Sequence, residues 1–241
     1  MKEEYSRTAM LLGATAVERL NNSNVLIFGL GGVGSYTAEA LARAGVGRLT
    51  LVDGDRISLS NINRQLYALH STVGRFKTEA ARERILDINP DCEVRIITDF
   101  VTTKNIDGFF PEKYDFCVDA IDDTAAKTAI AVKCGETGTP LIASMGTGAK
   151  LSGEFFKITD INKTEYCPLC RVMRRKYRDA GLKRVTVLYS PESPVSPKFI
   201  PENEDAKRLP PSSISFIPSQ AGLRIAEYTI KKLTEEAEKG M

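Results

Sequence analysis

Several features that would mark a specialised class of protein are missing from this sequence. The 241 residues carry a net charge of only +2, so any surface for a polyanion must be local. No apolar run approaches the length of a membrane span. The start, Met1 to Tyr5, has no apolar segment of the kind that forms a secretion signal. We therefore expect a cytoplasmic protein with no membrane partner.

Histidine and cysteine are scarce. His70 is the only histidine and has no evident acidic partner nearby in the sequence, so we expect a structural role for it. The five cysteines are odd in number and mostly lie in apolar surroundings, which favours a reducing compartment. Cys167 and Cys170 form a lone C-x-x-C, whereas a structural zinc site usually needs four protein ligands. Packing at the start of a helix is favoured; a metal shared across a dimer and a redox pair are the alternatives.

A glycine-rich turn is the centre of the predicted fold. Residues 24–28 form a short, mostly apolar run, which predicts a buried strand. Residues 35–44 have small and apolar side chains at helical spacing, which predicts a helix. Glycine at a strand-to-helix turn lets a pyrophosphate approach the main chain, and the helix start attracts anions. A plain structural turn is the alternative. We expect a nucleotide to bind at Gly29, Gly31, Gly32 and Gly34.

Polar residues after the next predicted strand extend this site. The strand covers 48–52 and is followed by Asp53, at about the spacing where a carboxylate meets ribose hydroxyls; capping a turn is the alternative role. Residues 59–66 are rich in amide and guanidinium donors, which suit a triphosphate because arginine makes bidentate bonds to phosphate oxygens. A simple polar loop is the alternative. The expected nucleotide contacts are Asp53, Asp55, Asn61, Asn63, Arg64 and Gln65.

Two more charged residues are predicted to face the nucleotide. Lys77 lies in the first turn of a helix expected over residues 74–88, where the helix dipole disfavours a cation unless an anion is near. A strand over residues 114–123 ends in two acids, at the sheet edge where ligands bind. Asp123 is suited to cap the helix that follows. Asp122 is then the better candidate to hold Mg²⁺ beside phosphates.

The order of the predicted elements indicates the fold class. Strands alternate with helices, which predicts an α/β, Rossmann-like doubly wound and mostly parallel sheet with an antiparallel carboxyl-terminal extension. We expect residues 1–160 to form a nucleotide-binding domain and residues 161–241 to pack on the same domain. The remaining expected elements are a helix over 8–20, strands over 94–98, 141–144 and 155–159, a last strand over 213–218 and a final helix.

A cationic helix distinguishes the last third of the chain. Its bases are concentrated in an otherwise nearly neutral protein, and clustered lysine and arginine are the main source of affinity for nucleic acid. A solvated surface helix is the alternative. Prolines break up residues 189–212, which predicts a mobile loop that either folds over a substrate or is a disordered connector. We expect RNA contacts from Arg171, Arg174, Arg175, Lys176 and Arg178.

Together these motifs resemble the adenylating domain of ubiquitin-activating-type enzymes, which include the bacterial ThiF, MoeB and HesA proteins. The resemblance covers about residues 1–160 and implies that they form an ATP-binding adenylation domain. It implies that a carboxylate attacks the α-phosphate of ATP, with Mg²⁺ present, to give an acyl-adenylate and pyrophosphate. The matching stretches are Gly29 to Gly34, Asp53-x-Asp55, Ser60 to Gln65, Gly74-x-x-Lys77 and Asp119-x-x-Asp122.

The resemblance also implies roles for individual residues. Asp53 would contact the ribose, Asn61, Arg64 and Lys77 the phosphates, and Asp122 the metal. The segment Tyr5-Ser6-Arg7 is similar to an amino-terminal segment of the family whose arginine reaches the ATP of a neighbouring subunit, which implies a homodimer. The implied catalytic residues are Arg7, Arg64, Lys77 and Asp122.

The carboxyl-terminal third resembles one branch of that family, the tRNA threonylcarbamoyladenosine dehydratases. Its marks are the stretch from Pro168 to Arg175 and the stretch from Ser213 to Gly222. The branch usually has Asp and Ala where this chain has Cys167 and Cys170, which puts a metal or sulfur role there in doubt. The resemblance implies ATP-dependent dehydration, by ring closure, of threonylcarbamoyladenosine in tRNA. Intramolecular attack on the adenylate gains from proximity, so no protein thiol is required.

Two other functions stay open at this point. The first is adenylation of the carboxyl terminus of a ubiquitin-like sulfur-carrier protein, against which the missing second C-x-x-C and the cationic helix argue. A cysteine desulfurase or sulfur acceptor is a further candidate partner, whichever substrate the enzyme uses. The second is a redox or non-catalytic module for a nicotinamide dinucleotide, which would leave Arg64, Lys77 and Asp122 without a purpose.

Overall fold

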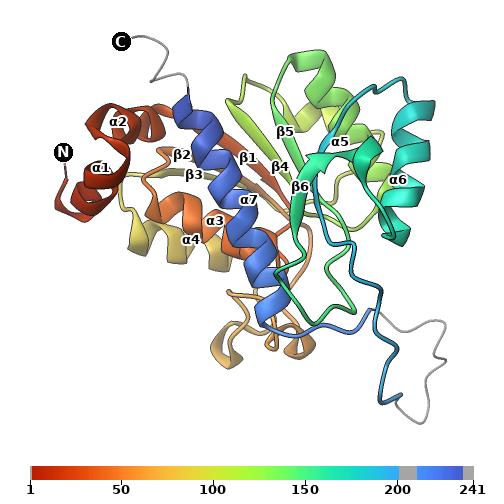
Figure 1. Ribbon diagram of the computed structural model, residues 1–241. Helices are drawn as coiled ribbons and strands as arrows, with labels where there is room; N and C mark the ends of the chain where they lie inside the picture. Colours follow the sequence, from red (N-terminus) through yellow and green to blue (C-terminus); the bar gives the residue numbers. More distant parts are fainter. Residues whose placement is uncertain (1, 201–210, 236–241) are drawn as a thin grey trace.

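A seven-stranded sheet forms the centre of the computed structural model, which describes residues 2–200 and 211–235 (Figure 1). The strand order is β3-β2-β1-β4-β5-β7-β6. Neighbouring strands are parallel except for β6, which pairs antiparallel with β7. The predicted fold class is therefore confirmed. The strands are β1 (Asn24–Phe28), β2 (Arg48–Val52), β3 (Glu93–Ile97), β4 (Phe116–Asp119), β5 (Leu141–Ser144), β6 (Lys157–Asp160) and β7 (Thr186–Tyr189).

The central strand β1 is buried along its whole length because helices cover both faces of the sheet. Val25 and Ile27 pack in the core cluster that includes residues of α3 and α7. Leu26 and Phe28 point to the opposite face and pack against residues of α5. This explains why residues 24–28 are continuously apolar rather than alternating.

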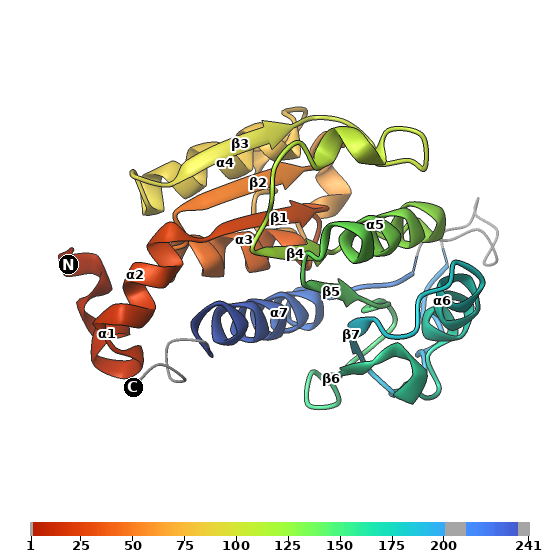
Figure 2. The ribbon, with the colours of Figure 1, turned by 90° about the horizontal axis from the view of Figure 1, so that it is seen from above.

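The helices are divided between the two faces of the sheet. In Figure 1, α7 crosses one face, and α3 lies against it. The opposite face is covered by α5, with α6 packed beside α5. Figure 2 shows α1 and α2 at the end of the sheet away from the arrowheads of β1, β2 and β3. The helices are α1 (Ser6–Leu12), α2 (Ala14–Asn22), α3 (Gly34–Arg43), α4 (Lys77–Ile88), α5 (Thr124–Thr137), α6 (Pro168–Asp179) and α7 (Phe216–Thr234).

The predicted last strand over residues 213–218 is wrong. Helix α7 begins at Phe216, and its fully buried Ile217 joins Ala221 and Ile225 in the core at helical spacing. Pro218 lies in the first turn, where a missing N–H breaks no helical hydrogen bond. The alternation of Ile214 with Phe216 looked like a strand pattern, but both side chains are partly exposed.

Two further elements differ from expectation. Strand β7 lies between β5 and β6, and the sequence reasoning did not assign it, although Val185 and Val187 supply a β-branched alternation just before the prolines. The helix expected over 8–20 is two helices, because Gly13 has a φ of 88° and interrupts the chain between α1 and α2.

The predicted proline-rich loop lies only in part within the described residues. Residues 190–200 contain no helix or strand, and residues 201–210 lie outside the described part of the chain. Among residues 2–200 and 211–235, no helix is long and apolar enough to cross a membrane.

Candidate functional site

A cavity of about 860 Å³ opens at the carboxyl ends of the parallel strands, where the strand order reverses between β1 and β4. Its wall combines the glycine turn after β1, the polar segment after β2, the acidic turn after β4 and the loop after β5. Leu169 at the start of α6 and Pro218 at the start of α7 complete it. The predicted nucleotide contacts that line it are Gly29, Gly31, Gly32, Asp53, Asp55, Asn61, Arg64, Gln65, Lys77 and Asp122.

The glycine turn is shaped by close backbone approaches. Gly29 has a φ of 87°, and a Cβ there would lie 2.8 Å from the carbonyl oxygen of Ala120. A Cβ on Gly34 would lie 1.8 Å from the carbonyl oxygen of Gly29. Gly34 is not among the residues that line the cavity. Its lack of a side chain instead allows the start of α3 to pack closely on the turn.

Asp53 organises this turn as well as facing the cavity. Its carboxylate accepts hydrogen bonds from the backbone N–H of Leu30 (2.6 Å) and from that of Asp55 (2.8 Å). Burial raises the pKa of Asp53, and the nearby Lys77 cation and the two backbone donors oppose that increase. The turn-capping contacts and the ribose role are therefore compatible, because the carboxylate still lines the cavity.

Lys77 is a buried cation at the cavity wall. Only 7% of its side chain is exposed, and its Nζ lies 2.7 Å from Asp55 Oδ2 and 3.9 Å from Asp53 Oδ2. The two carboxylates offset the unfavourable interaction of the Lys77 cation with the dipole of α4, in whose first turn it lies. Because two acids flank it, an entering phosphate would compete with Asp55 for the ammonium.

The polar segment after β2 is held by its own side chains. Asn61 Oδ1 accepts a hydrogen bond from the backbone N–H of Ser58 (3.1 Å). The Arg64 guanidinium donates to the carbonyl oxygen of Ser60 (3.0 Å) and to Asn63 Oδ1 (2.8 Å). Asn63 does not line the cavity. Its amide instead donates to the carbonyl oxygen of Ser213 (3.1 Å), which ties the segment before α7 to this loop.

The two acids after β4 have different surroundings. Asp123 caps α5, since its Oδ1 accepts hydrogen bonds from the backbone N–H groups of Ala125 (3.0 Å) and Ala126 (2.7 Å). Asp122 is exposed and lines the cavity, and within residues 2–200 and 211–235 no ion pair involves it. Its carboxylate is therefore available to a ligand or a cation in the cavity.

Sequence reasoning missed the segment that follows β3. Asp99, Phe100 and Val101 line the cavity, and the Phe100 ring is 61% exposed. A Cβ on Gly54 would lie 2.8 Å from this ring, so the aromatic face covers the turn after Asp53. An aromatic residue just after a parallel strand was the available signal, because every such strand ends at the same edge.

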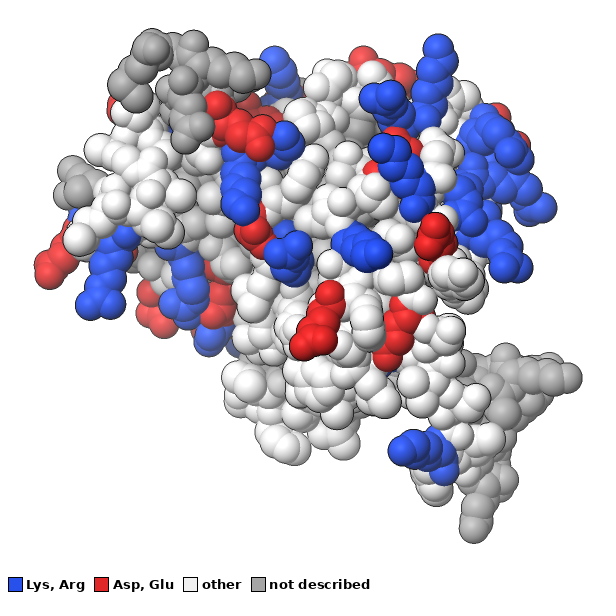
Figure 3. Space-filling model, viewed as in Figure 1, with Lys and Arg blue, Asp and Glu red and all other residues white. Residues whose placement is uncertain are grey.

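The cationic helix α6 presents one charged face to solvent. Arg171, Arg175 and Arg178 are exposed, and Figure 3 shows Lys and Arg gathered on the right-hand side, over α6. Arg174 differs, because it is half-buried and donates hydrogen bonds to the backbone carbonyl (2.6 Å) and the hydroxyl (2.5 Å) of Thr164. Lys176 is half-buried.

The two cysteines of the C-x-x-C are buried at the start of α6. Cys167 caps the helix, and its Sγ accepts a hydrogen bond from the backbone N–H of Cys170 (3.5 Å). The contact with the Cys170 thiol and the backbone N–H groups of Cys170 and Leu169 lower the pKa of Cys167. The same contact between the two thiols, together with burial, raises the pKa of Cys170. Both cysteines are free thiols packed in the core.

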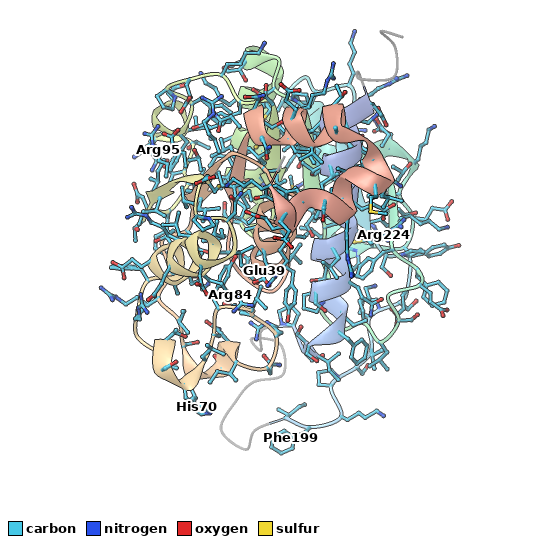
Figure 4. All side chains as sticks on the ribbon, turned by 90° about the vertical axis from the view of Figure 1, so that its left-hand side faces the viewer. Glu39, His70, Arg84, Arg95, Phe199 and Arg224 are labelled. Carbon is cyan, nitrogen blue, oxygen red and sulfur yellow. The ribbon has the colours of Figure 1, made fainter. Side chains whose placement is uncertain are left out.

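Arg7, an implied catalytic residue, and His70, for which a structural role is expected, both lie away from the cavity. Arg7 is exposed on α1, at the end of the sheet opposite the cavity, so it does not reach the cavity of its own chain (Figure 2). His70 is exposed in the short 3₁₀ helix His70–Thr72 and does not line the cavity either. In Figure 4 it lies in the segment that projects below the helices.

Comparisons with known proteins agree with this arrangement. The ThiF family profile matches residues 5–240. A tRNA threonylcarbamoyladenosine dehydratase of Bacillus subtilis (strain 168) is 41% identical over 250 residues, which cover 99% of this chain and 97% of that protein. The enzyme of the same name from Escherichia coli (strain K12) is 35% identical over 205 residues, or 82% of this chain and 76% of that protein.

A solved structure is also similar. The crystal structure of E. coli tRNA N6-threonylcarbamoyladenosine dehydratase, TcdA, in complex with ATP superposes with a TM-score of 0.90 at 31% identity. The match covers 99% of this chain and 97% of that one.

Proposed function

The chain belongs to the ThiF family, and we propose that it is an ATP-dependent tRNA threonylcarbamoyladenosine dehydratase. The observation that carries this proposal is the cavity. It unites a glycine turn, an arginine, a buried lysine and an available carboxylate at one edge of the sheet, in a fold that matches an ATP complex of such an enzyme over nearly its whole length.

ATP binding is assigned to the residues around that cavity. In this proposal the backbone N–H groups of Gly31 and Gly32 meet the phosphates, because those of Gly29 and Leu30 already donate to Val52 and Asp53, and a ribose hydroxyl donates to Asp53. Arg64 and Lys77 supply positive charge to the phosphates, with Asn61 and Gln65 beside them. Asn63 and Gly34 act indirectly in this proposal, by holding Arg64 and the turn.

A magnesium ion fits the donor set at Asp122. The described residues contain no cluster of three or more His, Cys, Asp or Glu side chains that could enclose a metal. Magnesium in nucleotide enzymes is commonly held by one or two carboxylates together with substrate phosphates, and Asp122 is such a carboxylate. When bound, the ion would neutralise charge on the phosphates.

The reaction needs positioning more than a protein nucleophile. The threonyl carboxylate attacks the α-phosphate, and pyrophosphate leaves. Arg64 and Lys77 stabilise the negative charge that develops on the phosphate oxygens. An atom of the urea group on the same side chain then attacks the activated carbonyl carbon and loses its proton, and the bond from that carbon to the AMP oxygen breaks. AMP leaves with one of the two original carboxylate oxygens, so the nucleoside loses the elements of one water. Neither of these two steps uses a thiol or sulfur, and a cysteine-desulfurase or sulfur-acceptor partner stays a separate proposal.

The tRNA is proposed to dock on the exposed face of α6. Arg171, Arg175 and Arg178 are four and three residues apart, which places them along one side of a helix. Leu169 in the first turn of the same helix lines the cavity, so a stem held along α6 would lie next to the reacting nucleotide. Arg174 stabilises the fold through Thr164 in this proposal and contributes less to the tRNA contact. Residues 1–160 thus supply the adenylation chemistry, and residues 161–235 supply the RNA surface.

A homodimer is proposed for the role of Arg7. Met10 and Leu11 on the same helix are 87% and 83% exposed, which is unusual for large apolar side chains next to each other. We propose that a second copy covers them and that Arg7 acts at the partner's cavity. We further propose that the enzyme works in the cytoplasm, where its five cysteines stay as thiols.

The test is a product assay. Purified protein, ATP and tRNA carrying threonylcarbamoyladenosine are incubated, the tRNA is digested, and the nucleosides are analysed by mass spectrometry. We expect the modified nucleoside to lose the mass of one water, with AMP and pyrophosphate formed. Exchange of pyrophosphate into ATP that a ubiquitin-like carrier protein stimulates, and tRNA does not, would instead support the sulfur-carrier function. Binding of NAD in place of ATP would support a dinucleotide module.

A further inference from the structure

A fully buried lysine joins two of the loops that form the cavity wall. The Nζ of Lys127 on α5 lies 2.9 Å from Asp119 Oδ2 at the end of β4, and both side chains are 0% exposed. The same Nζ donates hydrogen bonds to the carbonyl oxygen of Ile121 (3.2 Å) and to that of Ser144 (2.8 Å). The ammonium therefore makes two hydrogen bonds to backbone carbonyls and one ion pair, and Asp119 Oδ2 has no hydrogen-bond partner within the described residues besides this charge contact.

These partners lie at the ends of two neighbouring parallel strands. Ile121 directly precedes Asp122, and Ser144 begins the segment 144–148; both belong to the cavity wall. The carboxylate grips the same turn, because Asp119 Oδ1 accepts a hydrogen bond from the backbone N–H of Ile121 (3.3 Å). The ammonium therefore sets the distance between the acidic turn after β4 and the loop after β5.

Stability alone is a weak reason to keep this pair. Burying two charges costs several kcal/mol for each ion, and apolar side chains of similar volume are often as stable in such a place. Burial raises the pKa of Asp119, which is the sign of that cost, while Lys127 opposes the increase. An apolar pair could fill the space, but it could not hold two backbone carbonyls at a fixed separation.

We propose that Lys127 is a positioning residue for the adenylation step, which holds the Asp122 turn and the 144–148 loop in the arrangement that the carboxylate and the α-phosphate require. It touches no substrate, because its side chain is fully buried beneath both loops. This inference rests on the proposed function for its kinetic readout, but the structural clamp can be tested without a substrate.

The kinetic test compares Lys127→Met with a matched lysine on the same helix. Lys133 also forms an ion pair from α5, with Asp107 at 2.5 Å, but it does not line the cavity or contact either loop. We expect Lys127→Met to lower kcat for AMP formation about 10- to 100-fold, as displacement of reacting groups does. The KM for ATP should stay within about threefold, because the glycine turn and Arg64 are not held by Lys127. Lys127→Arg should recover part of kcat, and Lys133→Met should keep the wild-type values.

Hydrogen exchange gives a second readout that needs no substrate. In Lys127→Met the backbone amides of residues 119–123 and 144–148 should exchange about tenfold faster, and those of β1 should not change. A folded Lys127→Met variant with wild-type kcat, or with unchanged exchange in both loops, would overturn the proposal. If Lys127→Met does not fold, Asp119→Asn decides: a reduced kcat with a wild-type KM supports the clamp, and a wild-type kcat refutes it. If the wild type forms no AMP with modified tRNA, the proposed function fails, and the exchange data still judge the clamp.

Discussion

Lys77→Ala removes a cation that is buried in the wall of the nucleotide cavity. In the wild type its Nζ is 2.7 Å from Asp55 and 3.9 Å from Asp53, and the side chain is 7% exposed. The substitution therefore has two separable effects. It removes positive charge from the place where phosphate charge develops, and it leaves a buried carboxylate without its nearest cation.

The expected loss of activity follows from the first effect. A charged or polar donor aimed at the developing charge of a transition state contributes about 10²- to 10³-fold to the rate, or about 2.7–4 kcal/mol. We expect Lys77→Ala to lower kcat/KM for AMP formation by about this factor, measured at saturating modified tRNA with labelled ATP. Lys113→Ala is the control, because Lys113 is exposed and does not line the cavity.

The expected loss of stability follows from the second effect and depends on pH. An unpaired buried polar partner costs about 1–3 kcal/mol. Burial raises the pKa of Asp53 and Lys77 opposes the increase, so the pKa of Asp53 rises further in the variant. The folded variant then binds a proton more tightly than the unfolded chain does, so its stability falls as pH rises from about the ordinary aspartate value of 3.8 through the raised pKa. The deficit relative to wild type should therefore be larger at about pH 8 than at about pH 5 in urea unfolding.

The two measurements have distinct ways to fail. Wild-type kcat/KM in a folded Lys77→Ala variant would mean that the ammonium does not contact the phosphates and that Asp55 is its only partner. A stability deficit that is equal at both pH values would mean that Lys77 does not influence Asp53 at 3.9 Å. Either result would require a different assignment of the cavity.

Two further predictions concern surfaces outside the cavity. Replacing Arg171, Arg175 and Arg178 together by alanine should reduce the slope of log affinity for tRNA against log salt concentration by about two to three, since each phosphate contact contributes about 0.7–0.9; an unchanged slope in filter binding would place the tRNA elsewhere. Glu39 joins α3 to α4 through Arg84 (Figure 4), and contacts with that guanidinium lower the pKa of Glu39 although burial alone would raise it. Its stabilisation is present above the ordinary glutamate pKa of 4.5 and is lost as pH falls through the lowered value, so Glu39→Gln should cost about 1 kcal/mol near neutral pH and much less near pH 3 in thermal unfolding.

The glycine turn and the parallel strands before residue 160 were predictable because their signals are local. A buried parallel strand is continuously apolar, as residues 24–28 are, and Asp123 had the residue type and the position of a helix cap. The residues expected to meet a nucleotide follow different strands in the sequence, but the carboxyl ends of parallel strands share one edge of the sheet. The cavity therefore assembled most of them without further information.

The carboxyl-terminal third was harder because its elements depend on distant partners. Residues 213–218 alternate like a strand, but Ile217 is buried only because it packs on the sheet as part of a helix. β7 is only four residues long, so its β-branched alternation is a weak local signal, and the strand is defined by its pairing with β5 and β6. The partner of Lys127 was likewise out of reach, because the lysine looks like a surface residue of α5 until its side chain is followed into the core.

The cavity and the carboxyl-terminal segment are joined by close approaches at two glycines and by one side-chain hydrogen bond. A Cβ on Gly222 would lie 2.4 Å from the carbonyl oxygen of Val33, so α7 can lie this close to α3 only because that position is glycine. A Cβ on Gly32 would lie 2.9 Å from Pro218, and Asn63 binds the carbonyl oxygen of Ser213. The start of α7 thus rests on the same turn that is assigned to the phosphates. A substitution that shifts the start of α7 would therefore also shift the glycine turn. This is why α7, near the end of the described chain, contributes to a site that the sequence predicts from residues near its beginning.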